Sequence, residues 1–335
     1  MPWEKRMRYF EDFTVGETFS LTPVCLSAND RLAFFAAFEG GPLSSINSLL
    51  ADASVALLRN TAGGSLPDAA SFSPSPLTLS PWHVATAVWG KWVATKTDAG
   101  GMVAGMSIDF AHWYRCASTG DLLFGTVTIS RKRVFSGGDA GRVSFVLDVV
   151  DAHQRRIMDM EVTGKMQLRS PLVPRSLPSA SPKRQEESES SVLHVWHPTP
   201  FSLTEEEIMA FGRAFDDRPI HVNREVAAKG PFGGLIASGL HSMARLLGIW
   251  CATVLKKESD FPQENALEIC SARWLSPVRP AQTIVPSITL TKTENAPDGR
   301  VSLYFINRLA DEKNRPLLVC VLKSTMDSPS FPTNH

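Results

Sequence analysis

The stretch FDDRPIHVNREVAAKGPFGGLIASGLH, residues 215–241, holds two aspartates, two prolines, two histidines and four glycines. Pro219 cannot continue a helix that precedes it, so the chain must turn after Asp216. The glycine-rich part of the stretch allows close approach of the backbone and leads into a second helix. The pattern therefore predicts two helices joined by a turn that carries an acid and an imidazole, Asp216 and His221.

Apolar residues at helical spacing flank this stretch on both sides. Thr204 and Glu207 form a T-x-x-E capping box, which predicts a helix that begins there and runs to Phe215. The second helix is expected over roughly residues 239–256. One of its faces is apolar and consists of Leu240, Met243, Leu247, Cys251 and Val254.

The two halves of the chain resemble one another. Residues 26–44 align without a gap on residues 203–221, with two phenylalanines and the proline in the same places. Further on, residues 111–123 align on residues 272–284, and both segments begin Ala-x-Trp. A tail rich in β-branched and aromatic residues, with turn signals at matching places, follows in each half. We interpret this pattern as a duplication.

The expected fold class is α+β, with each repeat built as a long apolar helix wrapped by an antiparallel sheet. The two repeats are expected at residues 1–169 and 192–335. Residues 170–191 between them are rich in proline and serine and mixed in charge, which is typical of a linker or mobile loop.

The composition is that of an ordinary globular protein, with 335 residues of which 43% are hydrophobic and 20% charged. Its 34 basic and 34 acidic residues balance, so no electrostatic feature indicates nucleic acid or an anionic membrane as a partner. The five cysteines are scattered without a C-x-x-C pair, which indicates neither a disulfide framework nor a thiolate zinc site. Without an apolar signal core or a membrane-spanning run, a soluble intracellular protein is expected, cytoplasmic by default.

The turn at residues 216–221 suits general acid–base chemistry. A carboxylate and an imidazole that hold one water between them can exchange the roles of proton acceptor and donor. The second helix begins at the end of the glycine-rich segment, and a helix N-terminus offers unpaired N–H groups. An N–H at Ser238 or Gly239 is therefore a candidate donor for negative charge on a carbonyl oxygen.

These residues resemble a known family. The pattern D-x-(N/Q)-P-x-H, followed by A-x-x-x-x-F-G-G-x-I-A-x-G, is similar to that of the MaoC-like hydratases, the (R)-specific enoyl-CoA hydratases of the hot-dog fold. Residues 9–19 and 273–283 also resemble family segments. In this chain the pattern is written as Asp216, Arg218, Pro219, His221, Ala227, Phe232, Gly233, Gly234, Ile236, Ala237 and Gly239.

The resemblance implies two tandem hot-dog repeats and reversible addition of water to a trans-2-enoyl thioester, giving a (3R)-hydroxyacyl thioester. Asp216 and His221 would hold and activate the water, and the Gly239 amide would bind the thioester oxygen. No cofactor or metal is implied beyond a substrate carried on CoA or a carrier protein, and a homo-oligomer is expected. The residues implied to contact the substrate are Ser238, Arg218, Phe232 and Gly234.

Two residues depart from the family pattern. Arg218 stands where the family has Asn or Gln, and Asn223 where Asp often follows the histidine. A cation beside Asp216 lowers the pKa of that carboxyl group; alternatively the side chain points to solvent or to an anionic group on the substrate. In the first half, the gapless alignment places Glu39 opposite Asp216 and Ser44 opposite His221. We therefore expect one active site per chain, with the N-terminal repeat as scaffold and substrate tunnel.

Other interpretations stay open at this point. Asp216 and His221 are residue types that, taken alone, are more often structural than catalytic. A hot-dog thioesterase would release free thiol, and a degenerate acyl-thioester binding module would bind without turnover. A hydratase would instead remove the enoyl absorbance without releasing thiol.

Overall fold

The computed structural model describes residues 8–39, 78–95, 101–170, 192–255, 267–296 and 299–326. Almost all of the predicted linker, residues 171–191, lies outside these ranges, as does Ser44.

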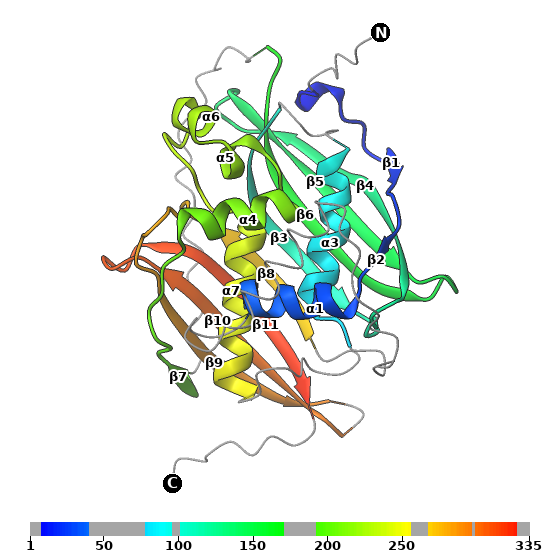
Figure 1. Cartoon of the computed structure of the whole chain (residues 1–335), viewed down its shortest axis with the longest axis vertical. Helices are drawn as coiled ribbons and strands as arrows, with labels where there is room; N and C mark the ends of the chain where they lie inside the picture. The colour runs from blue at the N-terminus through cyan, green and yellow to red at the C-terminus, as the bar shows by residue number, and fades with distance from the viewer. Residues whose placement is uncertain are drawn as a thin grey trace, which may run out of the picture.

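The described strands form one antiparallel sheet of eleven strands (Figure 1). Their order is β1-β4-β5-β6-β3-β8-β11-β10-β9-β7, and β2 pairs with β4 beside this path. The strands are β1 (Thr18–Ser20), β2 (Val24–Cys25), β3 (Met102–Trp113), β4 (Leu122–Val134), β5 (Ala140–Val150), β6 (Arg156–Gln167), β7 (His194–Trp196), β8 (Leu267–Trp274), β9 (Val285–Asn295), β10 (Val301–Ala310) and β11 (Pro316–Met326).

The long strands fall into two groups with the same internal order. Strands β4-β5-β6-β3 form one group and β9-β10-β11-β8 the other, and the groups join where β3 pairs with β8. The large antiparallel sheet agrees with the predicted α+β class. The residues Trp113 and Trp274, which coincide in the sequence alignment, each end one of the two central strands.

Two apolar helices, α3 and α7, lie in front of this sheet in Figure 1. Nearly every turn of both helices carries buried residues, mostly apolar, as expected for helices that pack against the sheet on one side and shorter helices on the other. No helix in the described ranges is long and apolar enough to cross a membrane. The helical segments are η1 (Phe10–Asp12), α1 (Ala28–Phe34), η2 (Phe35–Glu39), α3 (Pro81–Ala94), α4 (Glu205–Phe215), α5 (Pro219–Val222), α6 (Arg224–Lys229), α7 (Gly239–Trp250) and η4 (Cys251–Leu255).

Sequence predictions for the helices of the second half are confirmed. The Thr204 side chain accepts a hydrogen bond from the Glu207 amide, and the Glu207 carboxylate accepts one from the Thr204 amide, as a capping box requires. Helix α7 begins at Gly239 and continues as one π-helical turn to Leu255, so the predicted span of 239–256 covers both elements.

Each apolar helix packs against the other half of the chain. A side chain at Gly90 of α3 would lie 3.2 Å from the carbonyl oxygen of Phe215, at the end of α4. A side chain at Gly248 of α7 would lie 1.8 Å from the carbonyl oxygen of Glu39, at the end of η2. A larger residue at Gly248 would collide with backbone, whereas the contact at Gly90 is only tight, and the two halves form one continuous core.

Candidate active site

Helix α4 and the following turn bring Asp216 and His221 together. Asp216 is the C-cap of α4, with its amide bonded to the carbonyl oxygen of Gly212. Pro219 then begins a new helix, α5, because proline fits the first helical position where no N–H is needed. The predicted turn is thus a one-turn helix, which places His221 back beside the acid.

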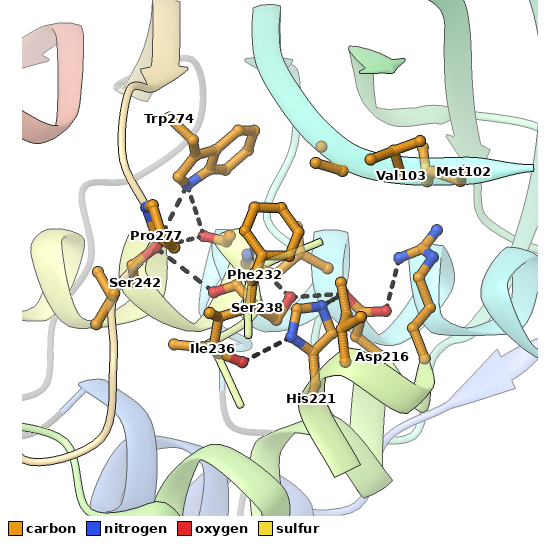
Figure 2. A pocket seen from close by; sticks show the side chains of 18 of the residues that line it. Met102, Val103, Asp216, His221, Phe232, Ile236, Ser238, Ser242, Trp274 and Pro277 are labelled. Atoms are coloured by element: carbon orange, nitrogen blue, oxygen red, sulfur yellow. Dashed lines mark hydrogen bonds and ion pairs between the residues drawn. The ribbon is translucent and has the colours of Figure 1, made fainter. Parts of the chain in front are cut away.

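Asp216 and His221 face one another across a short gap. Nε2 of His221 lies 3.4 Å from Oδ2 of Asp216 (Figure 2). The other ring nitrogen, Nδ1, lies 2.8 Å from the carbonyl oxygen of Ile236. Since a carbonyl oxygen only accepts, Nδ1 carries the hydrogen, and in the neutral ring Nε2 is left as an acceptor.

Two further side chains hold the Asp216 carboxylate. The Ser238 hydroxyl donates to Oδ2 at 2.6 Å, and Nη1 of Arg218 donates to Oδ1 at 2.6 Å. The side chain of Arg218 is 16% exposed and that of Asp216 5% exposed, so this ion pair is largely out of water. Of the three orientations considered for Arg218, the structure shows the one toward Asp216.

These contacts set the charge state of the pair. Burial raises the pKa of Asp216, but the charges of Arg218 and His221 and the hydrogen bonds from Ser238 and Arg218 together lower it below its usual value. Burial lowers the pKa of His221, and the nearby carboxylate offsets only part of that effect. At neutral pH the site therefore holds an ionised carboxylate and a neutral imidazole.

The N-terminus of α7 reaches the same place. Ser238 is the N-cap, and its side chain accepts from the Leu240 amide at 3.2 Å. Gly239 is the first helical residue, so its N–H has no partner within the helix, and no described group accepts a hydrogen bond from it. The indole of Trp274 donates to the Gly239 carbonyl oxygen at 3.1 Å. A Cβ at Gly239 would lie 2.6 Å from Cε2 of that ring, so a larger residue fits only if the ring or the start of α7 shifts.

Asp216, His221 and Gly239 all line one cavity of about 180 Å³. Its remaining wall is mainly apolar and includes Trp274 and Phe232 from the C-terminal half (Figure 2). The N-terminal half supplies the opposite wall through Trp89 of α3 and through Met102, Val103, Ala104 and Gly105 of β3. No residue of this wall was predicted from the sequence, because the pairing of β3 with β8 that brings it here leaves no local signal.

The predicted substrate-contacting residues divide into two groups. Ser238, Arg218 and Phe232 line the cavity, whereas Gly234 lies in the loop beside it and is not part of the lining. Gly234 has a φ of 156°, a conformation that favours glycine, and the loop is held by Arg279, whose Nη2 donates to the Phe232 carbonyl oxygen at 2.7 Å.

The first half contains a corresponding but different set of groups. Ser80, the N-cap of α3, donates a hydrogen bond to the buried carboxyl group of Glu39, as Ser238 does to Asp216. Trp113 donates to the Pro81 carbonyl oxygen at 3.0 Å, as Trp274 does to that of Gly239. Pro81 has no N–H, so the amide donor of α7 has no equivalent at the start of α3.

Comparison with known proteins finds a domain family that is similar to part of the chain. Residues 190–302 match the model of the MaoC like domain, a span that contains the whole site described above apart from the wall contributed by α3 and β3. This part of the chain is similar to the MaoC like domain, and solved structures described as MaoC-like dehydratases are among its structural neighbours.

Three solved structures support the hot-dog fold. A MaoC domain protein from Chloroflexus aurantiacus, described as a dehydratase, superposes with a TM-score of 0.69 at 17% identity, covering 97% of this chain and 99% of that one. A Mycobacterium tuberculosis protein described as having a double hotdog fold gives 0.59 at 15% identity, over 95% and 98%. The peroxisomal multifunctional enzyme type 2 of Drosophila melanogaster gives 0.56 at 13% identity, over 92% of this chain and 48% of that one.

One curated relative matches in sequence. The uncharacterized protein YdeM of Bacillus subtilis is 34% identical over 62 residues, which is 18% of this chain. The matched segment spans 44% of that relative's length.

Proposed function

We propose that the chain adds water reversibly to the double bond of a trans-2-enoyl thioester, giving a (3R)-3-hydroxyacyl thioester. The observation that carries this proposal is the pairing of Asp216 with His221, 3.4 Å apart, beside the N-terminal amide of α7 in one apolar cavity. The similarity of residues 190–302 to the MaoC like domain supports the same class of reaction.

The charge state of the pair suits the holding of a water molecule. Oδ2 of Asp216 and Nε2 of His221 are both acceptors 3.4 Å apart, so a water that lies beside this gap, on the cavity side, can donate one hydrogen to each. Its oxygen lone pair is then turned away from both acceptors. A double bond bound in the cavity meets the water on that side.

The proposed reaction balances with these two groups alone. As the water oxygen bonds to the β-carbon, one of its protons passes to the Asp216–His221 pair, and the electron pair of the double bond moves toward the α-carbon. The pair then delivers that proton to the α-carbon, and both side chains return to their starting state. Dehydration runs through the same steps in reverse.

The thioester oxygen gains negative charge during this step. The Gly239 N–H lies at the positive end of α7 and has no partner within the helix, so we assign it as the donor to that oxygen. A donor of this kind contributes about 3 kcal/mol to transition-state stability in enzymes where it has been removed.

We also propose a division of labour between the two halves. Residues 192–335 would form the catalytic repeat, residues 1–169 a repeat without its own catalytic pair, and residues 170–191 the linker. Pro81 supports this assignment, because it removes the amide donor in the first half. The contribution of Trp89 and β3 to the cavity wall supports a role of the first half in shaping the acyl site. The acyl carrier would be CoA or a carrier protein, and the assembly a homo-oligomer.

Hydration of enoyl-CoA substrates from crotonyl to long-chain tests the proposal, with thiol release followed in parallel. Asp216→Asn and His221→Ala should each lose nearly all turnover while keeping the fold, whereas Asp217→Asn, a change of the exposed neighbouring acid, should keep it. Thiol release by the wild type would favour a thioesterase. Binding without turnover at any chain length would favour an acyl-thioester binding module.

A further inference from the structure

We propose that Arg218 is a positioning residue that keeps the Asp216 carboxylate ionised and directs its Oδ2 toward Ser238 and His221. This inference rests on the proposed function, in which Asp216 is the proton acceptor. It assigns Arg218 a role toward the acid rather than toward an anionic group of the substrate.

The geometry of the ion pair carries the argument. Nη1 of Arg218 donates to Oδ1 at 2.6 Å, whereas the Ser238 hydroxyl and Nε2 of His221 lie at 2.6 and 3.4 Å from Oδ2. The arginine thus binds Oδ1 of the carboxylate, and Oδ2 is left to contact Ser238 and His221 beside the cavity. Arg218 is also the N-cap of α5 and precedes Pro219, which restricts its backbone to extended conformations.

The first half of the chain provides an internal comparison. Glu39 is as fully buried as Asp216 and also accepts a hydrogen bond from an N-cap serine, Ser80. Its arginine, Arg31, is 3.5 Å away through Nη1 and forms no hydrogen bond to it. Burial then dominates and raises the pKa of Glu39 to about 7. The bonded arginine is therefore the larger of two differences between the acids of the two halves; the second is His221, which lies beside Asp216.

The other groups that face Asp216 have weaker effects on its charge, and among them the charge of His221 ranks below that of Arg218. His221 on α5 is neutral at neutral pH, because burial lowers its pKa. On the α7 side, Ser238 is uncharged, and the pKa of His241, which interacts with His221, lies at about 3. Arg218 is the cation that acts on Asp216 most strongly.

Arg218→Gln, which introduces a residue typical of the family position, tests the inference. Without the cation, burial should raise the pH at which Asp216 takes up its proton toward the value of about 7 found for the buried Glu39, so that less than about a tenth of the carboxyl groups stay ionised at pH 5. We expect kcat/KM near pH 5 to fall at least about tenfold relative to wild type while activity near pH 8 is retained, since a less acidic carboxylate is a stronger base. Arg218→Lys keeps the charge and should shift the profile less.

Two controls keep the inference falsifiable. Arg224→Gln makes the same substitution at an exposed arginine that pairs with Glu205, and should leave the pH profile unchanged. Carboxyl ¹³C NMR of Asp216 gives a readout without substrate: wild type should show no titration between about pH 5 and 8, whereas Arg218→Gln should show one. An unchanged titration in Arg218→Gln overturns the inference. If the wild type lacks hydratase activity but Arg218→Gln still shows the new titration, the proposed function is wrong and the role of Arg218 toward Asp216 stands.

Discussion

The Ser238 hydroxyl donates a hydrogen bond of 2.6 Å to Oδ2 of Asp216, and so ties the start of α7 to the end of α4. The same hydroxyl accepts from the Leu240 amide, so one side chain caps a helix and holds the proposed proton acceptor. In the first half, Ser80 makes the corresponding two hydrogen bonds: its hydroxyl donates to the Glu39 carboxyl group and accepts from the His83 amide. This correspondence allows the structural role of a serine to be separated from its catalytic role.

Ser238→Ala and Ser80→Ala form a matched pair. Each change removes a helix cap and a buried hydrogen bond, so each should lower the free energy of unfolding by roughly 1 to 3 kcal/mol in chemical denaturation. Only Ser238→Ala removes a bond to the proposed proton acceptor, and it should lower kcat at least about tenfold. Equal loss of activity in the two variants would mean that the serine acts through stability alone.

Gly239→Ala tests the contact between the helix start and Trp274. An added Cβ would lie 2.6 Å from Cε2 of the indole, so either the ring or the α7 terminus must shift. Displacement of the Gly239 amide should cost about 3 kcal/mol of transition-state stabilisation, or about a hundredfold in kcat/KM.

Trp274→Phe removes the ring atoms that cause this clash. The double variant with Gly239→Ala should therefore recover part of the activity lost by Gly239→Ala, measured against Trp274→Phe alone. If the double variant is as inactive as Gly239→Ala alone, the steric explanation is wrong.

Local sequence signals predicted the elements that carry the acid and the imidazole. The capping box at Thr204, the chain-breaking Pro219 and the entry to α7 at Gly239 each depend on residues close in sequence. The fit of Trp274 against Gly239 and the cavity wall of Trp89 and β3 depend on strand pairing and helix crossing between distant segments. Such contacts have no local pattern in a single sequence. The orientation of Arg218 was likewise open, because a side chain two residues from an acid can point in several directions.

Glu39 should make stability fall as pH rises. Its pKa in the folded protein is about 7, against 4.5 for the unperturbed group, so between these values the folded state binds more protons than the unfolded state. The stabilising contribution is therefore complete below about pH 4.5 and lost as pH rises through about 7. The total is roughly 3 kcal/mol.

Glu39→Gln isolates this effect because glutamine does not titrate. Denaturation midpoints measured across this range should fall with pH more steeply in wild type than in the variant. Equal slopes for the two proteins would show that the folded Glu39 titrates like an exposed glutamate.

His241 should be a packing residue. Its ring stacks on Phe211 with centroids 4.5 Å apart, and neither ring nitrogen has a hydrogen-bond partner among the described residues. Burial lowers its pKa to about 3, so between about pH 6.5 and 3 the folded protein keeps the ring neutral while the unfolded chain takes up a proton, and stability falls as pH falls through this range.

His241→Phe removes the unpaired nitrogens and the titration together. We expect the variant to keep hydratase activity, to be at least as stable as wild type, and to lose less stability on acidification. Loss of activity with an intact fold would place His241 in the catalytic machinery.

Val103 tests whether the N-terminal half shapes the acyl site. It lies on β3 and faces the cavity together with Met102, opposite the Asp216–His221 pair (Figure 2). The cavity measures about 180 Å³, so enlarging this side chain takes up a substantial part of the room for an acyl group. Val103→Phe should therefore lower kcat/KM for medium-chain enoyl-CoA substrates at least about tenfold, since filling a packed apolar site costs typically 1 to 3 kcal/mol.

Turnover of the short substrate crotonyl-CoA by the same variant is the control. It should change less, because the catalytic groups are untouched. A uniform loss across all chain lengths would show that β3 supports the catalytic pair instead of the acyl group.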